Sequence, residues 1–448
     1  KESNRKYLGD VKIEGVVVME DGTVEEAELK TKDFVIWREI ELEKGEPLDW
    51  TKVIESDREL VNLNYFRTTD FPRPNQLNLV PGFQRKATDD PEVEDLLLQL
   101  EEIQTGMITF GGGFSTSFGP SIFASITERN LFGYGLRGTL AGEIGEWRNR
   151  FSVELREPYL FGSDFSMDWD AYYIDQEGYG GRSFDEERIG SSVLFGYEVD
   201  EELDFLFGFK GEQTDLSPES GNTYDLDPAS IPEVFNMGEN ITTSVTLGVV
   251  QDRRDFKLDP TSGTYLRSTV ELAGITDNEF VKWSNKGHYY YSLWDKLILA
   301  LSTEIDVGHA YGDPGFIPLQ ERYFVGGART VRGFDEGGIG EYAAIMYKDP
   351  SFGGYRSYLG GEAAWINNVE FRYPFTQAIQ GVWFFDAGTN WPEIEDFNPA
   401  DFRLSTGLGV RVRIPGINAT VRLDFPFVLR KFDEDDTESF HFSFGQTF

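Results

Sequence analysis

Apolar and polar residues alternate with a period of two along most of this chain, from residue 106 to residue 448. In Phe165–Tyr173 every odd position is apolar, whereas Ser166, Asp168 and Asp170 are polar. Successive side chains of a β-strand point to opposite faces, so each such segment predicts a strand with one apolar face. About sixteen segments follow one another at intervals of roughly 21 residues, the spacing of antiparallel strands that close into a barrel.

The apolar face of these strands is predicted to face lipid. A barrel of about sixteen strands has a lumen too wide for side chains to fill, so an apolar face turned inward would line water. The connections alternate between short turns, such as 158–163, and long polar loops, such as 213–240 and 426–438. Short turns on one rim and long loops on the other are typical of outer-membrane barrels. We therefore expect a mainly β fold, a transmembrane antiparallel β-barrel in the bacterial outer membrane.

The chain is strongly acidic, with 41 Lys and Arg against 78 Asp and Glu and a formal net charge of −37. Nucleic acids are bound by clustered cationic side chains, so a nucleic-acid partner is not expected. The acidity fits a saline habitat and equally fits loops that bind divalent cations. Cysteine is absent, which excludes disulfides, thiolate metal sites and a cysteine nucleophile.

Residues 9 to about 100 show a different pattern and are predicted to form a small α+β domain. A β-like run at 9–19 is followed by apolar residues at near-helical spacing over 34–40. A second helix is expected to begin after Asp49, whose side chain suits an N-cap. The remaining predicted elements are strands near 66–71 and at 93–100 and a Pro- and Asn-rich loop at 71–82.

One long segment, residues 309–362, interrupts the alternation. Segments of this length without regular structure are rare between strands unless they are functional or disordered. At its middle lies Gly326–Phe334, in which two arginines stand out in an acidic chain. Arg332 is followed by a glycine and an aromatic residue, which suit a tight turn wedged among strands. The pattern predicts a loop folded onto the sheet and held by charge; a solvated surface loop is the alternative.

Several motifs of the chain resemble those of one family. Val331-Arg332-Gly333-Phe334 resembles the VRGF signature in the sixth extracellular loop of the BamA-type outer-membrane β-barrel assembly factors. Residues 9–100 resemble the last POTRA domain of that family. Arg58–Phe66 resembles a POTRA helix of the family. Three segments resemble its periplasmic turns: Asn130–Gly135, Arg156–Tyr159 and Pro260–Gly263. Phe385–Gly388 and the final Phe-Gly-Gln-Thr-Phe resemble features of its late strands. The match covers nearly the whole chain, and the order and spacing of the motifs make it specific.

The resemblance implies two domains. Residues 1–103 correspond to one small α+β POTRA domain, the last of an array in the periplasm. Residues 104–448 correspond to the barrel, with loop 309–362 folded inward. Two features depart from the family pattern: only one POTRA domain is present, and Met19–Leu29 adds sequence that suits an extra hairpin.

The resemblance also assigns a set of lumen residues. Arg332 corresponds to the loop arginine that reaches into the lumen and pairs with acidic groups on two later strands, at positions that match Glu370 and Asp386. Alternation agrees for Glu370, because Val369 and Phe371 take the outward face. Unrelated lumen charges are the alternative.

The function implied by the resemblance is that of an insertase within a β-barrel assembly machinery, which folds other β-barrel proteins into the outer membrane without covalent chemistry. Its partners are expected to be outer-membrane lipids, unfolded β-barrel clients and accessory periplasmic lipoproteins bound through the POTRA domain. The alternative is a secretion or translocation pore, such as the two-partner secretion transporters, which share the VRGF-like loop and POTRA domains. The residues upstream of Lys1 would separate the two.

No motif predicts an enzyme. Gly133–Gly138 fits the dinucleotide fingerprint, but it opens an alternating strand with no helix behind it. His288, His309 and His441 are scattered and lack metal-ligand spacing. We therefore expect no catalytic residue, no cofactor and no metal site.

The first and last barrel strands are predicted to form the weakest pairing, a lateral seam between residues 107–115 and 440–448. Three consecutive glycines lie in the first strand, and glycine weakens a strand through lost packing and larger backbone entropy. In the last strand, Gly445 lies where a kink or bulge can end pairing. The residues expected at the seam are Gly111, Gly112, Gly113, Phe444, Gly445 and Phe448. The alternative is that the glycines only let the POTRA linker or loop 309–362 approach closely.

Overall fold

The computed structural model divides into two compact units. It describes residues 6–19, 23–67, 82–116, 119–178, 184–200, 202–218, 227–257, 259–294, 296–312, 315–349, 351, 353–414 and 419–445. The first unit comprises Lys1–Ile108, Ile126–Thr139 and Leu155–Ser163, and the second comprises Thr109–Ser125, Leu140–Glu154 and Asp164–Phe448. Within the described ranges, no helix is long and apolar enough to cross a membrane.

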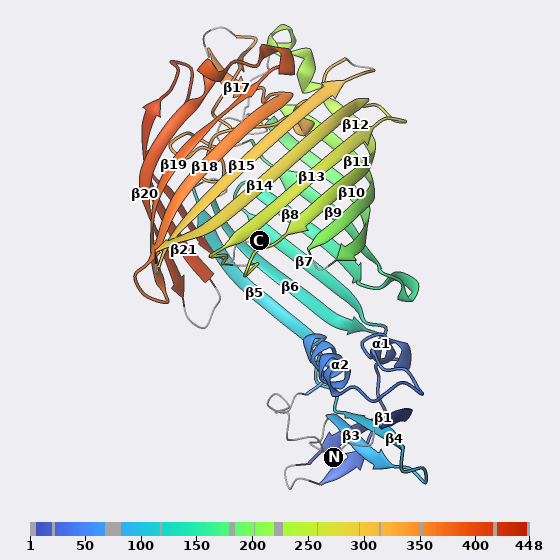
Figure 1. The fold of residues 1–448 in the computed structure, drawn as a ribbon. Coiled ribbons are helices and arrows are strands. Elements are labelled where there is room, and N and C mark those ends of the chain that lie inside the picture. The colour runs from blue at the N-terminus through green and yellow to red at the C-terminus, as the bar shows by residue number, and fades with distance from the viewer. Residues whose placement is uncertain are drawn as a thin grey trace. The chain divides into compact units, whose positions relative to one another are not determined.

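The first unit contains a four-stranded sheet with two helices. The strand order is β2 (Val24–Glu26), β1 (Tyr7–Val18), β4 (Val93–Leu100) and β3 (Gly82–Ala87), with β1 and β4 parallel. The helices are α1 (Asp33–Trp37) and α2 (Trp50–Asn62) (Figure 1). Val35 and Ile36 of α1 pack with Leu60 of α2 and with Leu96 and Leu98 of β4 in one hydrophobic core.

The predicted elements of this domain agree with the structure in part. Asp49 caps α2, because its side chain accepts a hydrogen bond from the backbone N–H of Thr51 at 2.8 Å. The expected strand near 66–71 is reduced, within the described residues, to a bridge between Phe66 and Glu102. Strand β3 was not predicted, because its sequence, Gly-Phe-Gln-Arg-Lys-Ala, is mostly polar and has one buried residue. Gly82, which was expected in the loop, is the first residue of this strand. Residues 68–81 lie outside the described residues.

Sixteen strands of the described chain close into an antiparallel barrel (Figure 1), as predicted. They are β5 (Gly106–Ser115), β6 (Gly119–Leu131), β7 (Leu136–Gly145), β8 (Arg148–Glu157), β9 (Phe165–Gln176), β10 (Phe184–Asp200), β11 (Leu203–Pro218), β12 (Gly238–Asp252), β13 (Gly263–Ala273), β14 (Phe280–Trp294), β15 (Leu297–Ala310), β18 (Ala363–Pro374), β19 (Ile379–Trp391), β20 (Arg403–Ile414), β21 (Ala419–Arg430) and β22 (His441–Gly445). Exposure alternates along β19: Trp383 and Phe385 are exposed, whereas Phe384 and Asp386 are buried. An outward face rich in aromatic residues is what a lipid-exposed barrel requires.

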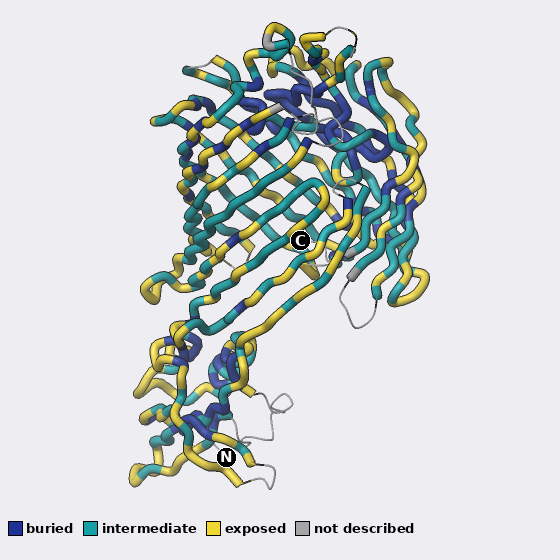
Figure 2. The backbone as a smooth tube through the Cα atoms, turned by 180° about the vertical axis from the view of Figure 1, so that it is seen from behind, coloured by how far each residue is buried: buried dark blue, intermediate teal, exposed yellow. Residues whose placement is uncertain are grey.

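The segment between β15 and β18 has more regular structure than the sequence indicated. It contains a short 3-10 helix, Leu319–Glu321, and a two-stranded hairpin of β16 (Tyr342–Met346) and β17 (Gly354–Tyr358). Much of its length is buried, as the dark-blue stretches of the tube show in Figure 2. A loop with this many buried residues is packed against other parts of its unit and is not a solvated surface loop.

One glycine of β5, Gly111, has a packing partner that the sequence did not suggest. A Cβ atom at Gly111 would lie 2.6 Å from the ring of Phe123 on β6, whereas a Cβ atom at Gly112 would make an ordinary contact, 3.4 Å from the carbonyl oxygen of Ser121. Glycine at position 111 therefore makes room for an aromatic ring of the neighbouring strand.

We predict that Gly111→Val destabilises the barrel by about 1–3 kcal/mol, the usual cost of overpacking. The measurement is the urea midpoint of unfolding followed by tryptophan fluorescence. In a Phe123→Ala background the same substitution should cost little, because the ring is gone. Gly112→Val is the matched control; an equal loss at both glycines would contradict the packing explanation.

Candidate functional site

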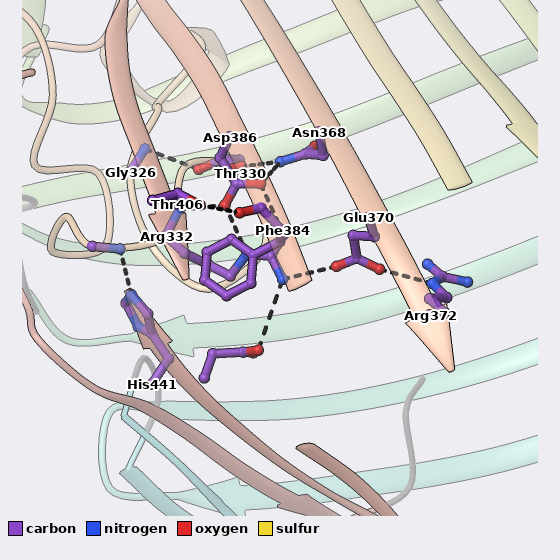
Figure 3. Close-up of polar contacts among 12 residues, drawn as sticks. Gly326, Thr330, Arg332, Asn368, Glu370, Arg372, Phe384, Asp386, Thr406 and His441 are labelled. Carbon is purple, nitrogen blue, oxygen red and sulfur yellow. Dashed lines mark hydrogen bonds and ion pairs between the residues drawn. The ribbon is translucent and has the colours of Figure 1, made fainter. Parts of the chain in front are cut away.

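The loop arginine Arg332 is enclosed by two acidic residues of the barrel strands. Its Nε and Nη2 atoms donate to the two carboxylate oxygens of Asp386 on β19, at 2.7 and 2.8 Å. Its Nη1 atom donates to Glu370 on β18 at 2.8 Å (Figure 3). The side chains of Arg332 and Asp386 are 5% and 0% exposed, so the pair is almost completely removed from solvent. The structure thus brings together Arg332, Glu370 and Asp386.

Further groups complete the surroundings of this guanidinium. The Arg332 Cζ atom lies 3.6 Å from the centre of the Phe384 ring, a cation–π contact. Asn368 donates both to Asp386 and to the backbone carbonyl of Thr330, at 2.8 and 2.7 Å, and so ties the loop backbone to the acid. Burial by itself lowers the pKa of Arg332, but the hydrogen bonds and charge of Asp386 outweigh it and raise the pKa above its ordinary value. The guanidinium therefore stays charged.

The other residues of the motif fix the shape of the turn. Gly333 has φ of 96°, a conformation that side chains rarely adopt, and a Cβ atom there would lie 3.0 Å from Val428. Its N–H donates to Nε2 of His441 on β22 at 2.9 Å. Val331 and Phe334 are fully buried in one apolar cluster with Ile339 and neighbouring residues. The motif thus presents its arginine to the strands while its apolar residues pack together.

Several residues of this site were not identified from the sequence. Asp424 on β21 lies 3.8 Å from Arg332, and His441, Asn368 and Phe384 contact the motif as described above. The alternation of β21 contains a usable signal, because an inward Arg422 predicts an inward Asp424 two residues later. Nothing in the sequence indicates that His441 accepts a hydrogen bond from the loop.

The seam between β22 and β5 is short. Two pairs are in register, Ser443 with Ser115 and Phe444 with Phe114. One further hydrogen bond joins the N–H of Thr116 to the carbonyl of Phe442 at 3.0 Å.

The pairing on the other side of β22 is longer, with five pairs between β21 and β22, including Gly445 with Thr420. These numbers refer to the described part of both strands. Phe448 lies outside it. Gly111, Gly112 and Gly113 lie on β5 beyond the two paired residues.

Comparisons with known proteins give the family. The Omp85 superfamily domain matches residues 130–448. The chain belongs to the Omp85 superfamily. It is 28% identical over 430 residues to the outer membrane protein assembly factor BamA of Nitratidesulfovibrio vulgaris, covering 94% of this chain and 50% of that protein. The chain spans about half the length of the curated relatives it matches.

Solved structures have the same fold. The crystal structure of BamA from Haemophilus ducreyi lacking POTRA domains 1–3 matches with a TM-score of 0.79 and 20% identity, over 99% of this chain and 85% of that one. CdiB from Acinetobacter baumannii matches with a TM-score of 0.57 and 12% identity, over 98% and 73%. The relatives named as outer membrane proteins and the closed β-barrel place this chain in the bacterial outer membrane.

We predict that Arg332→Ala destabilises the barrel unit by about 3–5 kcal/mol, because it leaves Asp386 charged and buried without its partner. The urea midpoint measures this loss, and trypsin cleavage within residues 309–362 measures the release of the loop. Arg332→Lys keeps the charge without the planar fork and should recover part of the stability.

The control for this prediction is Arg356→Ala, in an exposed pair with Asp436 whose side chains are 45% and 40% exposed. Exposed ion pairs contribute about 0–1 kcal/mol. Equal effects at Arg332 and Arg356 would refute the argument from burial.

Proposed function

We propose that this chain is the membrane part of an insertase that folds β-barrel proteins into the outer membrane, within a β-barrel assembly machinery. The observation that supports it most is the seam, where, in the part of β22 that the structure describes, two register pairs join it to β5 while five join it to β21. Within the described residues, 106–113 of β5 lie beyond the two register pairs, and we infer that this part of β5 is where another strand can pair. The BamA relatives carry the name of outer membrane protein assembly factors.

The physical reason is the cost of bare backbone in lipid. Each unpaired N–H or carbonyl in the hydrocarbon core costs several kcal/mol, so a client strand needs a partner before it enters. An openable barrel edge supplies that partner by strand addition, without covalent chemistry. The motif Val331–Phe334 would hold the loop in place while the edge is in use.

The partners of this activity are proposed to be unfolded β-barrel clients, outer-membrane lipids and accessory periplasmic lipoproteins bound through the POTRA domain, residues 1–103. The barrel is assigned to residues 104–448. A secretion or translocation pore is the alternative function; it would pass a chain through the lumen and would not need β5 and β22 to separate.

We predict that the long loops face the cell exterior. Asp433→Cys, an exposed position between β21 and β22, should react with a membrane-impermeant maleimide on intact cells, whereas Ser163→Cys, in the short turn between β8 and β9, should react only after the outer membrane is opened. The native chain has no cysteine, so there is no background. The reverse labelling pattern would overturn the orientation.

We predict that locking the seam stops client insertion. Ser115→Cys with Ser443→Cys places two thiols directly opposite each other across the seam. The oxidised protein should fail to insert a client barrel into liposomes, and reductant should restore the rate. Thr269→Cys with Ser284→Cys, opposite each other on β13 and β14, is the matched control. If the oxidised seam variant inserts the client at the normal rate, opening of the seam is not needed for insertion, and the pore is favoured.

A further inference from the structure

Two arginines face each other directly across neighbouring strands next to the seam. Arg411 of β20 is the register partner of Arg422 of β21, Arg422 is the partner of Ser443 of β22, and Ser443 is the partner of Ser115 of β5. Directly opposed residues point to the same face of a sheet. These four residues, which we call the arginine row, therefore lie on one face, with the two arginines at one end and the seam at the other. Like charges opposite each other destabilise an antiparallel pair.

The same row lines a cavity of about 780 Å³ in the barrel unit. Seven arginines and four acidic residues line it, an excess of three positive charges in a chain whose net charge is −37. Asp386, which binds Arg332, reduces the excess to two. Ser115 and Ser443 also line the cavity, so it reaches the seam.

The acidic residues on this wall are shared among the arginines. Glu370 binds Arg332 and also Arg372, whose Nε atom lies 2.8 Å from its second oxygen. Asp424 lies 2.8 Å from Arg411 and 3.8 Å from Arg332. Glu370 and Asp424 therefore each serve two guanidinium groups, and since an arginine presents five donors, this wall can accept a further carboxylate.

We propose that this cavity binds carboxylate side chains on the inward face of a β-strand that pairs with β5. The proposal rests on the proposed function, because it needs a client strand at the seam. A residue that takes the place of Ser443 opposite Ser115 would point into the cavity, in the row of Arg422 and Arg411. The planar fork of arginine suits carboxylates. The seam would then select strands whose inward side chains are acidic.

The test uses two fluorescein-labelled peptides of about ten residues, the length of a spanning strand. Both carry the same Val and Tyr residues at odd positions, with Glu at the even positions of one and Gln at those of the other. Their affinity for the full chain in lipid nanodiscs is measured by fluorescence anisotropy at low salt. The Glu peptide is expected to bind about tenfold tighter, as charge-assisted contacts should give. The net charge of −37 alone predicts the opposite order.

The double variant Arg411→Gln with Arg422→Gln should reduce this preference to about twofold or less. Arg413→Gln is the control: Arg413 lies on the same strand as Arg411 but forms an exposed pair with Asp259 and does not line the cavity. The heat-dependent shift of the folded barrel on SDS gels verifies that each variant is folded. If the double variant does not fold, Arg422→Lys, which keeps the charge without the fork, should weaken the preference in its place.

The outcomes separate this proposal from the proposed function. Equal binding of the two peptides, or a preference that survives the arginine substitutions, overturns the carboxylate site and leaves strand addition intact. If neither peptide binds, both the carboxylate site and strand addition at the seam are overturned. If the Arg413→Gln variant also loses the preference for the Glu peptide, the preference comes from overall charge, and the carboxylate site is overturned.

Discussion

The structure of the barrel unit depends on the burial of one guanidinium group. Removing an arginine from water costs several kcal/mol, and only close partners with good geometry compensate for it. Arg332 has these partners on β18 and β19, with Asp424 of β21 at a longer distance, and the ion pairs join the loop to strands that follow it in the chain. The loop arginine has its partners only when these strands are paired, and Asp386 has its arginine partner only when the loop is in place. Loop and sheet stabilise each other through this contact.

A second set of charges ties the same loop to the other strands. Glu321, which is buried, binds Lys210 of β11 at 3.1 Å and also Lys282 of β14, and the carbonyl of Gln320 accepts a hydrogen bond from Arg188 of β10. The loop thus connects β10, β11 and β14 with β18 and β19. Because a buried ion pair broken from one side is strongly destabilising, both attachments restrict the loop to one position.

The sequence predicted the elements that repeat and missed those that depend on single contacts. Alternation gave the barrel and the limits of the loop, which the structure places between Ala310 and Ala363. The positions of Glu370 and Asp386 required a family resemblance, since alternation states only which face a charge occupies. Strand β3 and the hairpin β16–β17 were missed because pairing with a neighbour, and not their own pattern, makes them strands. The space that Gly111 leaves for Phe123 depends on the register of β5 and β6, which composition does not contain.

The loop is bound more strongly to β18 and β19 than to β22, the strand that forms the seam with β5. On β18 and β19 it is held by charged, buried hydrogen bonds to Glu370 and Asp386. On the described residues of β22, 441–445, the motif makes one hydrogen bond, from the N–H of Gly333 to His441, and a neutral hydrogen bond contributes about 0.5–1.5 kcal/mol. Breaking the contacts of Arg332 costs several times more. Of the three strands to which the motif is hydrogen-bonded here, β22 is therefore the one held without an ion pair, whereas β18 and β19 are held by charged contacts.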